Sequence, residues 1–230
     1  MSKHLTRDLE DLQRRVMGMA TRVEEAIYAA LRALKERDSL LAKKVVAADE
    51  AIDALENEIY EECLRMIAMH QPVAIDLRQI AATFMVTTDL ERMGDLAVEI
   101  AERAAALVGL SDLLTERDAT GESLSARLSR MADVSTSQVR ESLDAFINMA
   151  GATARRVMRL DAEVDRLHVE IIRDLMALMR SSPAAVEPGL SLFSAVRSLE
   201  RIADHATNIA EDVVYLVDGD IVRHQPHCVE

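Results

Sequence analysis

The chain has 230 residues with a formal net charge of −13, and 50% of its residues are hydrophobic although only 3% are aromatic. This length provides material for one large domain or two small ones. So strong a negative charge repels phosphate backbones, and few aromatic rings are available to stack on bases, which excludes nucleic acid as the expected partner.

The apolar residues recur every three or four positions along most of the chain, which predicts long amphipathic helices and an all-α fold. Asp38 offers an N-cap between the first two helices, and Pro72 is expected in the first turn of the third. Gly109, Gly151 and Gly219 are expected just beyond the ends of helices. Six helices are therefore expected, over residues 5–37, 40–69, 72–108, 122–150, 152–180 and 189–217.

The second half of the sequence repeats the first. LERMGDLAVEIAE (90–102) and LERIADHATNIAE (199–211) are identical at 8 of 13 positions, and AKKVVAADEAIDALENEI (42–59) aligns with ARRVMRLDAEVDRLHVEI (154–171). Such self-similarity indicates two equivalent three-helix units. The expected division is a first repeat over 1–110, a linker over 111–121, a second repeat over 122–218 and a polar tail over 219–230.

The ends of the chain and its cysteines indicate the compartment. The N-terminal stretch MSKHLTRDLEDLQRR is polar and has no signal-peptide pattern, and no run of about 18 apolar residues is present. Cys63 and Cys228 form no CxxC motif; Cys63 lies in a helical pattern and is expected to be a buried thiol. We therefore expect a cytoplasmic protein with no transmembrane segment.

Acidic residues spaced four apart occupy matching places in the two repeats. On a helix, carboxylates at this spacing are neighbours and repel each other by roughly 0.2–0.5 kcal/mol. Glu99 extends one of the stripes in the first repeat, whereas the second repeat has Asn208 at that place, and both are counted with the pairs as candidate metal ligands. The matched pairs are Asp49/Asp53 and Glu91/Asp95 in the first repeat, and Asp161/Asp165 and Glu200/Asp204 in the second.

Two interpretations of these pairs compete. A solvated helix face is the ordinary explanation of any single pair, since 40 of the 230 residues are acidic. Repetition of a repulsive stripe in both repeats instead favours cation sites, and all-oxygen ligands suit magnesium, manganese, calcium or iron. His168 and His205 lie beside the acids of the second repeat and would shift that site toward iron or zinc, unless their role is structural. Arg92 and Arg201 follow the motif glutamates and would orient the carboxylates, unless they are ordinary surface arginines.

Other chemistry has little support in the sequence. There is no glycine-rich phosphate loop, no HExxH motif and no recognisable nucleophile context. A di-iron bundle needs ExxH motifs on two helices. DRLH (165–168) approximates this motif once, but the first repeat has DALE (53–56) in its place. This asymmetry argues against a di-iron catalyst.

The segments QPVAIDLRQI, TTDLERMGDLAVEIAERA and SLERIADHATNIAEDVVYLVDG resemble the PhoU family of phosphate-uptake regulators, and the resemblance covers both repeats in order. It implies two pseudo-symmetric three-helix bundles, multinuclear metal clusters on E(D)xxxD motifs, self-association as a homodimer and no catalysis. The family motif falls on Glu91 and Asp95 in the first repeat and on Glu200 and Asp204 in the second. Asn208 departs from the fuller acidic pattern, so the second cluster is expected to hold fewer or different ions.

The resemblance also implies a role in signalling. PhoU-like proteins connect the ATPase subunit of the phosphate ABC transporter to the membrane sensor histidine kinase, at the inner face of the membrane. When phosphate is plentiful they keep the starvation response off and restrain uptake. The hypothesis is thus a metal-binding cytoplasmic adaptor that carries iron, zinc, manganese or magnesium. The alternatives are a carboxylate-bridged iron protein with oxidase or storage activity, and a purely structural bundle.

Overall fold

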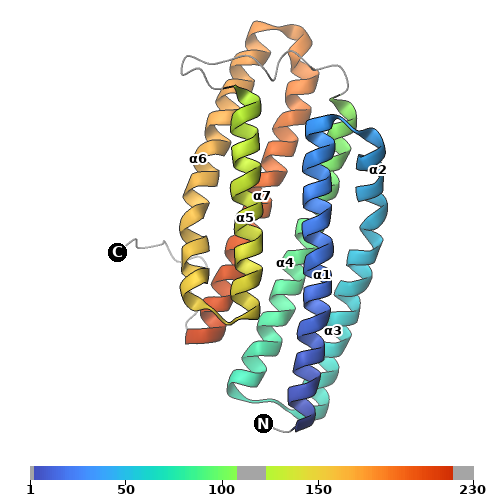
Figure 1. Ribbon diagram of the computed structural model, residues 1–230, viewed down its shortest axis with the longest axis vertical. Helices are drawn as coiled ribbons and strands as arrows, with labels where there is room; N and C mark the ends of the chain where they lie inside the picture. The colour runs from blue at the N-terminus through green and yellow to red at the C-terminus, as the bar shows by residue number, and fades with distance from the viewer. Residues whose placement is uncertain (1–2, 108–122, 220–230) are drawn as a thin grey trace.

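The computed structural model describes residues 3–107 and 123–219, and long helices account for almost all of these ranges (Figure 1). The expected all-α architecture is confirmed. None of the helices within 3–107 and 123–219 is long and apolar enough to cross a bilayer. The elements are α1 (Lys3–Glu36), α2 (Ser39–Ala48), α3 (Glu50–His70), α4 (Ala74–Ala106), α5 (Leu124–Ile147), α6 (Gly151–Ser181), the short 3-10 helix η1 (Pro183–Ala185) and α7 (Val186–Asp218).

The expected second helix corresponds to α2 and α3 together. As predicted, Asp38 caps its N-terminus, because its side chain accepts hydrogen bonds from the backbone N–H groups of Leu40 (2.9 Å) and Leu41 (3.0 Å). The two segments meet at Asp49, whose φ of −64° and ψ of −40° keep the backbone helical. The helices α2 and α3 therefore form an almost unbroken rod (Figure 1). Asp49, the first of the predicted metal ligands, lies at their junction.

Two chain reversals lie beside the positions expected from the sequence. Pro72 precedes α4 instead of lying in its first turn, because Gln71 adopts a left-handed conformation (φ 46°) and turns the chain first. Gly151 was expected to end a helix but begins α6. There the reversal occurs at Met149, whose φ is 48°.

A proline in the first turn and a glycine at the C-terminal end mark the two ends of α7. The helix begins at Val186, before the expected Gly189, because Pro188 is tolerated in the first turn, where backbone N–H groups have no intrahelical partner. At the other end Gly219 caps the helix in a left-handed conformation (φ 82°), as predicted. The expected glycine stop at 109 and the linker over 111–121 lie outside the described residues, as does the tail beyond 219.

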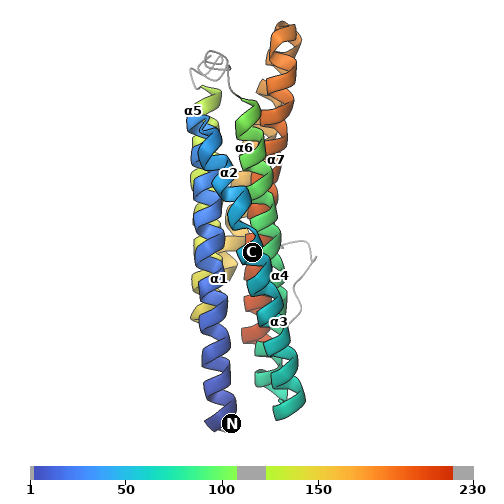
Figure 2. The same ribbon diagram turned by 90° about the vertical axis from the view of Figure 1, so that its right-hand side faces the viewer.

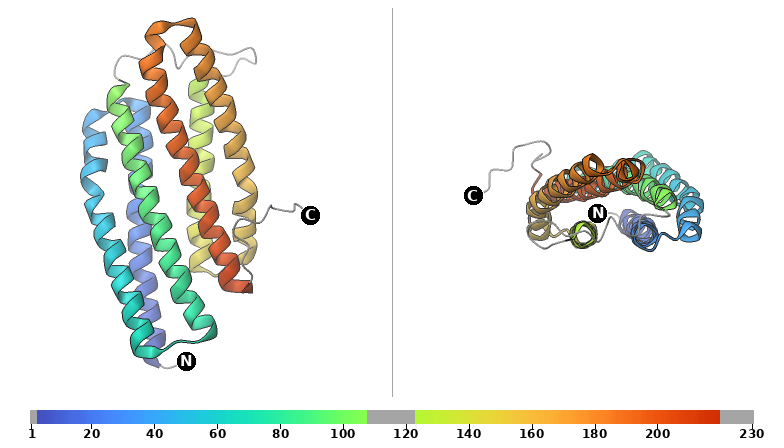
Figure 3. Two further views of the ribbon diagram at one scale, coloured as in Figure 1. Left: turned by 180° about the vertical axis from the view of Figure 1, so that it is seen from behind. Right: turned by 90° about the horizontal axis from the view of Figure 1, so that it is seen from above.

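The helices form two antiparallel three-helix units that meet along α4 and α7. The first unit comprises α1, α2–α3 and α4, and the second comprises α5, α6 and α7. Seen from above, α1 and α5 lie in one layer while α6, α7, α4 and α2–α3 form a curved second layer (Figure 3). The side view in Figure 2 shows the same two layers, with α1 and α5 on one side and α4 and α7 on the other. The helices are long rods, and α1, with 34 residues, extends about 50 Å.

Small residues on α4 and α7 are buried in the core. Four alanines on these helices, Ala97, Ala101, Ala203 and Ala206, have no exposed surface. Cys63 on α3 is also fully buried, and burial raises the pKa of its thiol to about 12. The expectation of a buried thiol is therefore confirmed, whereas Cys228 lies outside the described residues.

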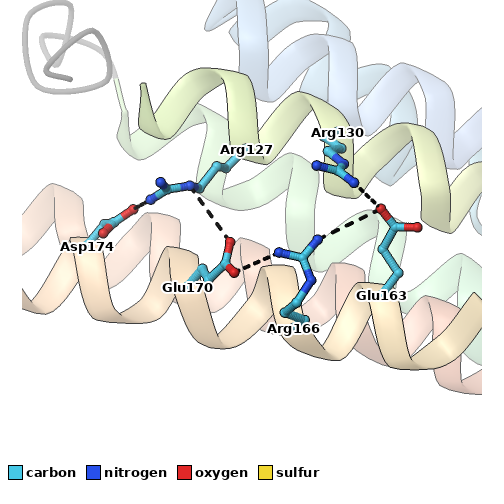
Figure 4. Close-up of polar contacts among 6 residues, drawn as sticks. All are labelled: Arg127, Arg130, Glu163, Arg166, Glu170 and Asp174. Carbon is cyan, nitrogen blue, oxygen red and sulfur yellow. Dashed lines mark hydrogen bonds and ion pairs between the residues drawn. The ribbon is translucent and has the colours of Figure 1, made fainter. Parts of the chain in front are cut away.

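An ion-pair network joins α5 to α6 (Figure 4). Arg127 is almost fully buried and pairs with Asp174, while its Nε lies 3.9 Å from Oε2 of Glu170. The first repeat has a counterpart at the same place, since Nη1 of Arg15 lies 2.9 Å from Oε2 of Glu58. The network between α5 and α6 continues along these helices through three more side chains, Arg166, Glu163 and Arg130 (Figure 4).

Candidate metal-binding clusters

The predicted ligands of the first repeat come together where α3 packs against α4. Asp49 and Asp53 lie at the start of α3, and Glu91 and Asp95 lie one turn apart on α4. The charges of Asp53 and Asp95 act on both Asp49 and Glu91, so the carboxylates of the two helices are electrostatic neighbours. We call Asp49, Asp53, Glu56, Glu91 and Asp95 the first acidic cluster.

Gly94 allows α3 to approach α4 at this cluster. A Cβ atom at Gly94 would lie 3.2 Å from Cδ1 of Ile52 and 3.3 Å from Oδ1 of Asp49, both closer than ordinary van der Waals contact. Any larger residue would therefore displace the carboxylate of Asp49. The second repeat has Ala203 at the corresponding position, fully buried, so its two helices do not need the same approach.

Burial and like charges both disfavour ionised carboxylates in the first acidic cluster. Partial burial, followed by the charges of Asp95, Glu56 and Asp53, raises the pKa of Glu91 to about 7. Burial and neighbouring carboxylates also raise the pKa of Asp49 and of Asp95. The cluster therefore contains unfavourable negative charge that a cation would neutralise.

The second repeat forms an equivalent cluster between α6 and α7. Asp161 and Asp165 come from α6, and Glu200 and Asp204 come from α7; we call these four the second acidic cluster. Asp204 keeps solvent-exposed surface, yet loss of hydration followed by the charges of the other three carboxylates raises its pKa to about 7, against the opposing effect of His205. The pairs that the sequence places in matching positions thus form one cluster in each repeat.

The two histidines beside the second acidic cluster lie in different surroundings. Nδ1 of His168, a half-buried residue, is 3.8 Å from Oε1 of Glu200, which places this ring at the edge of the cluster. His205 is buried, and its Nδ1 lies 2.8 Å from Oδ1 of Asp89 on α4. One ring nitrogen of His205 is thus hydrogen-bonded to a residue of the first repeat.

The two motif arginines also differ. Arg92 is exposed but lies near its cluster, since its charge lowers the pKa of both Glu91 and Asp95. Arg201 is exposed too, and within residues 3–107 and 123–219 it forms no ion pair with an acidic residue. Arg92 forms no ion pair among these residues either, so a carboxylate-orienting role stays a prediction for both arginines.

The third position of each stripe faces the opposite repeat. Oγ of Ser198 on α7 donates a hydrogen bond of 2.8 Å to Oε2 of Glu99 on α4. Reciprocally, Nδ2 of Asn208 on α7 donates to Oδ1 of Asp89 on α4 at 3.4 Å. Ser198 occupies the repeat position of Asp89, and Asn208 that of Glu99, so the two contacts are related by the pseudo-symmetry of the repeats.

The donor chemistry of both clusters fits a hard cation, and binding requires a rearrangement of side chains. Within residues 3–107 and 123–219, no three His, Cys, Asp or Glu side chains converge closely enough to hold one ion in their present rotamers. The candidate ligands are at least partly accessible, and Asp53, Asp95, Asp165 and Asp204 are exposed, so the surrounding protein leaves these carboxylates room to rotate.

The candidate ligands chosen from the sequence did not include Glu56 or Asp89, although the repeat alignment had already placed Glu56 opposite His168 beside the first site. Glu56 contributes to the raised pKa of Glu91, and its position three residues after Asp53, opposite His168 in the repeat alignment, was a usable signal. Asp89 is buried between the repeats with His205 and Asn208 as neighbours. No local pattern marks Asp89, because its partners come from the other half of the chain.

Comparison with known proteins gives the same family for both repeats. The model of the PhoU domain matches residues 16–104 and again residues 128–213. The chain is 38% identical over 224 residues to the phosphate-specific transport system accessory protein PhoU homolog of Pseudomonas putida, covering 97% of this chain and 84% of that protein.

Two solved structures share the fold. The crystal structure of PhoU from Pseudomonas aeruginosa has a TM-score of 0.86 and 36% sequence identity, and the match covers 94% of this chain and 99% of that one. The crystal structure of the phosphate transport system regulatory protein PhoU from Streptococcus pneumoniae has a TM-score of 0.81 and 27% identity, with coverage of 95% and 99%.

Proposed function

The chain belongs to the PhoU family, and we propose that it regulates phosphate transport by restraining uptake and keeping the phosphate-starvation response off when phosphate is plentiful. The observation that carries this proposal is the similarity to phosphate-specific transport system accessory proteins over nearly the full length of both repeats. A partial match to one helical repeat would carry no such weight, since helical bundles serve many functions.

The proposed mode of action is that of an adaptor. Its partners are the ATPase subunit of the phosphate ABC transporter and the sensor histidine kinase, at the inner face of the membrane, and a homodimer is the proposed form of the protein. Two features support contacts with proteins: the helices are long rods that offer extended surfaces, and the net charge of −13 disfavours nucleic acid.

Metal ions are proposed as structural components of the adaptor. Carboxylates of the first acidic cluster and of the second acidic cluster would hold magnesium, manganese, iron or zinc, with His168 at the edge of the second. A bound ion would neutralise the repulsion that raises the pKa of Glu91 and Asp204. Since each cluster has carboxylates on two helices, a bound ion would also hold α3 to α4 and α6 to α7.

A role without catalysis is favoured over a carboxylate-bridged iron enzyme. The iron enzyme would need histidine ligands in both halves. The first acidic cluster supplies carboxylates alone, whereas His168 and His205 both lie beside the second. Metal analysis of the purified protein, followed by visible spectra recorded with oxygen and with peroxide, separates the two candidates. Turnover of either oxidant would favour the enzyme.

Deletion of the gene tests the proposed function. The deletion strain should express phosphate-starvation genes in phosphate-rich medium, and the wild-type gene should restore repression. A variant that removes the charges of both motif pairs (Glu91→Gln, Asp95→Asn, Glu200→Gln, Asp204→Asn) should fail to restore it. A matched control, Glu58→Gln with Glu62→Gln, neutralises an acidic pair of the same spacing on α3 and should restore repression. Continued repression in the deletion strain would contradict the proposal.

A further inference from the structure

A cavity of about 290 Å³ opens where α1 and α5 lie side by side in the same layer (Figures 1 and 3). These two helices come from different repeats, and the cavity has α4 and α7 behind it. Its apolar lining consists of one alanine and of leucines from α1, α5, α7 and the C-cap of α4: Leu31, Leu34, Leu107, Leu128, Ala132 and Leu192. Leu34, Leu107 and Leu192 are buried, so the floor belongs to the core, whereas Leu31 and Leu128 remain partly exposed.

The two walls of this groove carry different charges. The α1 wall presents Arg32 and Lys35, both exposed; Glu36 lies at its outer end, with Oε2 3.9 Å from Nε of Arg32. The α5 wall presents Asp133 and the small, exposed Ser125 and Ser129.

The two helices that form the walls are hydrogen-bonded to each other near one end of the groove. Nη2 of Arg140 on α5 donates a hydrogen bond of 2.6 Å to the Tyr28 hydroxyl on α1. From there the groove follows α1 to Glu36 and α5 back to Ser125, which makes it elongated along the helices. At a rise of 1.5 Å per residue these walls extend about 12–17 Å, or two to three helical turns.

The distribution of polar groups favours a helix over a small molecule as the occupant. A small-molecule site places a few buried polar groups to fix the orientation of its ligand. Here Arg32, Lys35, Ser125, Ser129 and Asp133 all lie on the exposed rim, and the floor is formed by leucines. An apolar floor between charged rims is the form of a groove that binds an amphipathic helix.

We propose that this groove binds an amphipathic helix of a partner protein, with its apolar stripe on Leu31 and Leu128, an acidic flank toward Arg32 and Lys35, and a basic flank toward Asp133. The opposite charges of the two walls fix which way the helix runs. The cavity is about twice the size of one that holds a benzene ring, roughly 150 Å³, so two anchors of leucine or phenylalanine size fill it. The inference rests on the proposed adaptor function, because it names a surface through which an adaptor would hold a partner.

Binding of a designed peptide to the full-length protein tests the groove. The probe is a fluorescent helical peptide of about 18 residues, with leucines at i, i+4 and i+7, glutamates on one flank and lysines on the other. Ser129→Trp, an exposed position, fills the groove without altering the core and should weaken binding at least 30-fold, roughly the effect of losing a central anchor. Arg32→Glu with Lys35→Glu should weaken it about tenfold. A second peptide with lysines on both flanks should bind this charge-reversed protein more tightly than the first peptide does.

Controls separate the groove from general effects of charge. Lys43→Glu with Lys44→Glu makes the same change of charge at exposed sites on α2 and should leave binding unchanged. Equal binding to the wild type and to Ser129→Trp, an equal loss in the α2 control, or no binding to the wild type at about 1 mM peptide would overturn the proposal. So would a change of oligomeric mass on Ser129→Trp in light scattering, which would make the occupant a second copy of the chain.

The cellular test distinguishes this inference from the proposed function. Ser129→Trp should derepress the phosphate-starvation genes as the gene deletion does, while the protein keeps wild-type thermal stability and metal content. Repression that persists with this variant, although the deletion derepresses, would overturn the groove alone. A deletion that leaves repression intact would instead contradict the proposed function.

Discussion

Nδ1 of His205 on α7 lies 2.8 Å from Oδ1 of Asp89 on α4, and both residues are buried where the two repeats meet. The same carboxylate oxygen accepts a longer hydrogen bond from Asn208 (3.4 Å). His205 adjoins Asp204 in the second acidic cluster, so this contact connects one candidate metal site to the helix that carries the other.

Removal of the His205 ring should destabilise the protein. We expect His205→Ala to lower the free energy of unfolding by about 1–3 kcal/mol, since a buried carboxylate loses a close hydrogen-bond partner. Urea denaturation of the metal-free protein measures this. His168→Ala serves as the control, because its nearest carboxylate is 3.8 Å away; its effect should stay within about 0.5 kcal/mol. Equal effects would show that the contact with Asp89 is energetically unimportant.

The duplicated arginines offer a matched pair of substitutions. Arg127→Ala should cost about 3 kcal/mol, because it leaves Asp174 and Glu170 without their nearly buried partner (Figure 4). Arg15→Ala, at the equivalent place in the first repeat, removes a side chain that is 48% exposed and should cost less than about 1 kcal/mol. Thermal unfolding in the same buffer compares the two variants, and a larger loss for Arg15→Ala would contradict the burial argument.

Metal content should follow the acidic clusters. Replacement of Glu91 and Asp95 by alanine should remove about half of the bound ions and leave the helices folded, because half the carboxylate clusters remain and local repulsion falls. Elemental analysis with circular dichroism tests both statements. Glu58→Ala with Glu62→Ala, an acidic pair of the same spacing on α3, should leave metal content unchanged. Unaltered metal in the Glu91/Asp95 variant would remove these residues from the ligand set.

The raised pKa of Glu91 predicts a definite pH dependence. Its pKa moves from an ordinary 4.5 to about 7 in the folded protein, so between these values the folded state binds more protons than the unfolded state. Stability of the metal-free protein should therefore fall as pH rises from about 4.5 to 7. Glu91→Gln should flatten this decline and raise stability at pH 8 by about 1 kcal/mol after solvent screening. A wild-type decline that persists unchanged in Glu91→Gln would assign it to other groups.

The two clusters should differ in metal preference. His168 and His205 lie only beside the second cluster, and imidazole favours zinc or iron, whereas carboxylates alone suit magnesium or manganese. Titration of Mn²⁺ and Zn²⁺ into each half-site variant (Glu91/Asp95 or Glu200/Asp204 to alanine) measures this selectivity. Identical selectivity of the two clusters would make both histidines bystanders.

Both clusters should release metal as pH falls below about 7, where Glu91 and Asp204 gain protons.

The sequence by itself determined the class of fold, the duplication and the acidic pairs of each repeat. These properties are local: a spacing of three and four defines a helix face, and pairs such as Glu91/Asp95 stand on one face wherever that helix packs. The ends of the helices were predicted less accurately from the sequence. Gly151 begins α6 instead of ending the helix before it, and α7 begins at Val186, before the expected Gly189, because glycine and proline are each compatible with more than one position at a helix end.

Only the tertiary structure decided which faces meet. It paired Asp89 with His205 and Glu99 with Ser198 across the repeats, brought Glu56 to the first acidic cluster, and left the groove between α1 and α5 open. The periodicity of a helix states which side chains share a face, but it does not state which other helix covers that face. That choice depends on contacts between residues about a hundred positions apart, and these form only when both repeats pack along α4 and α7.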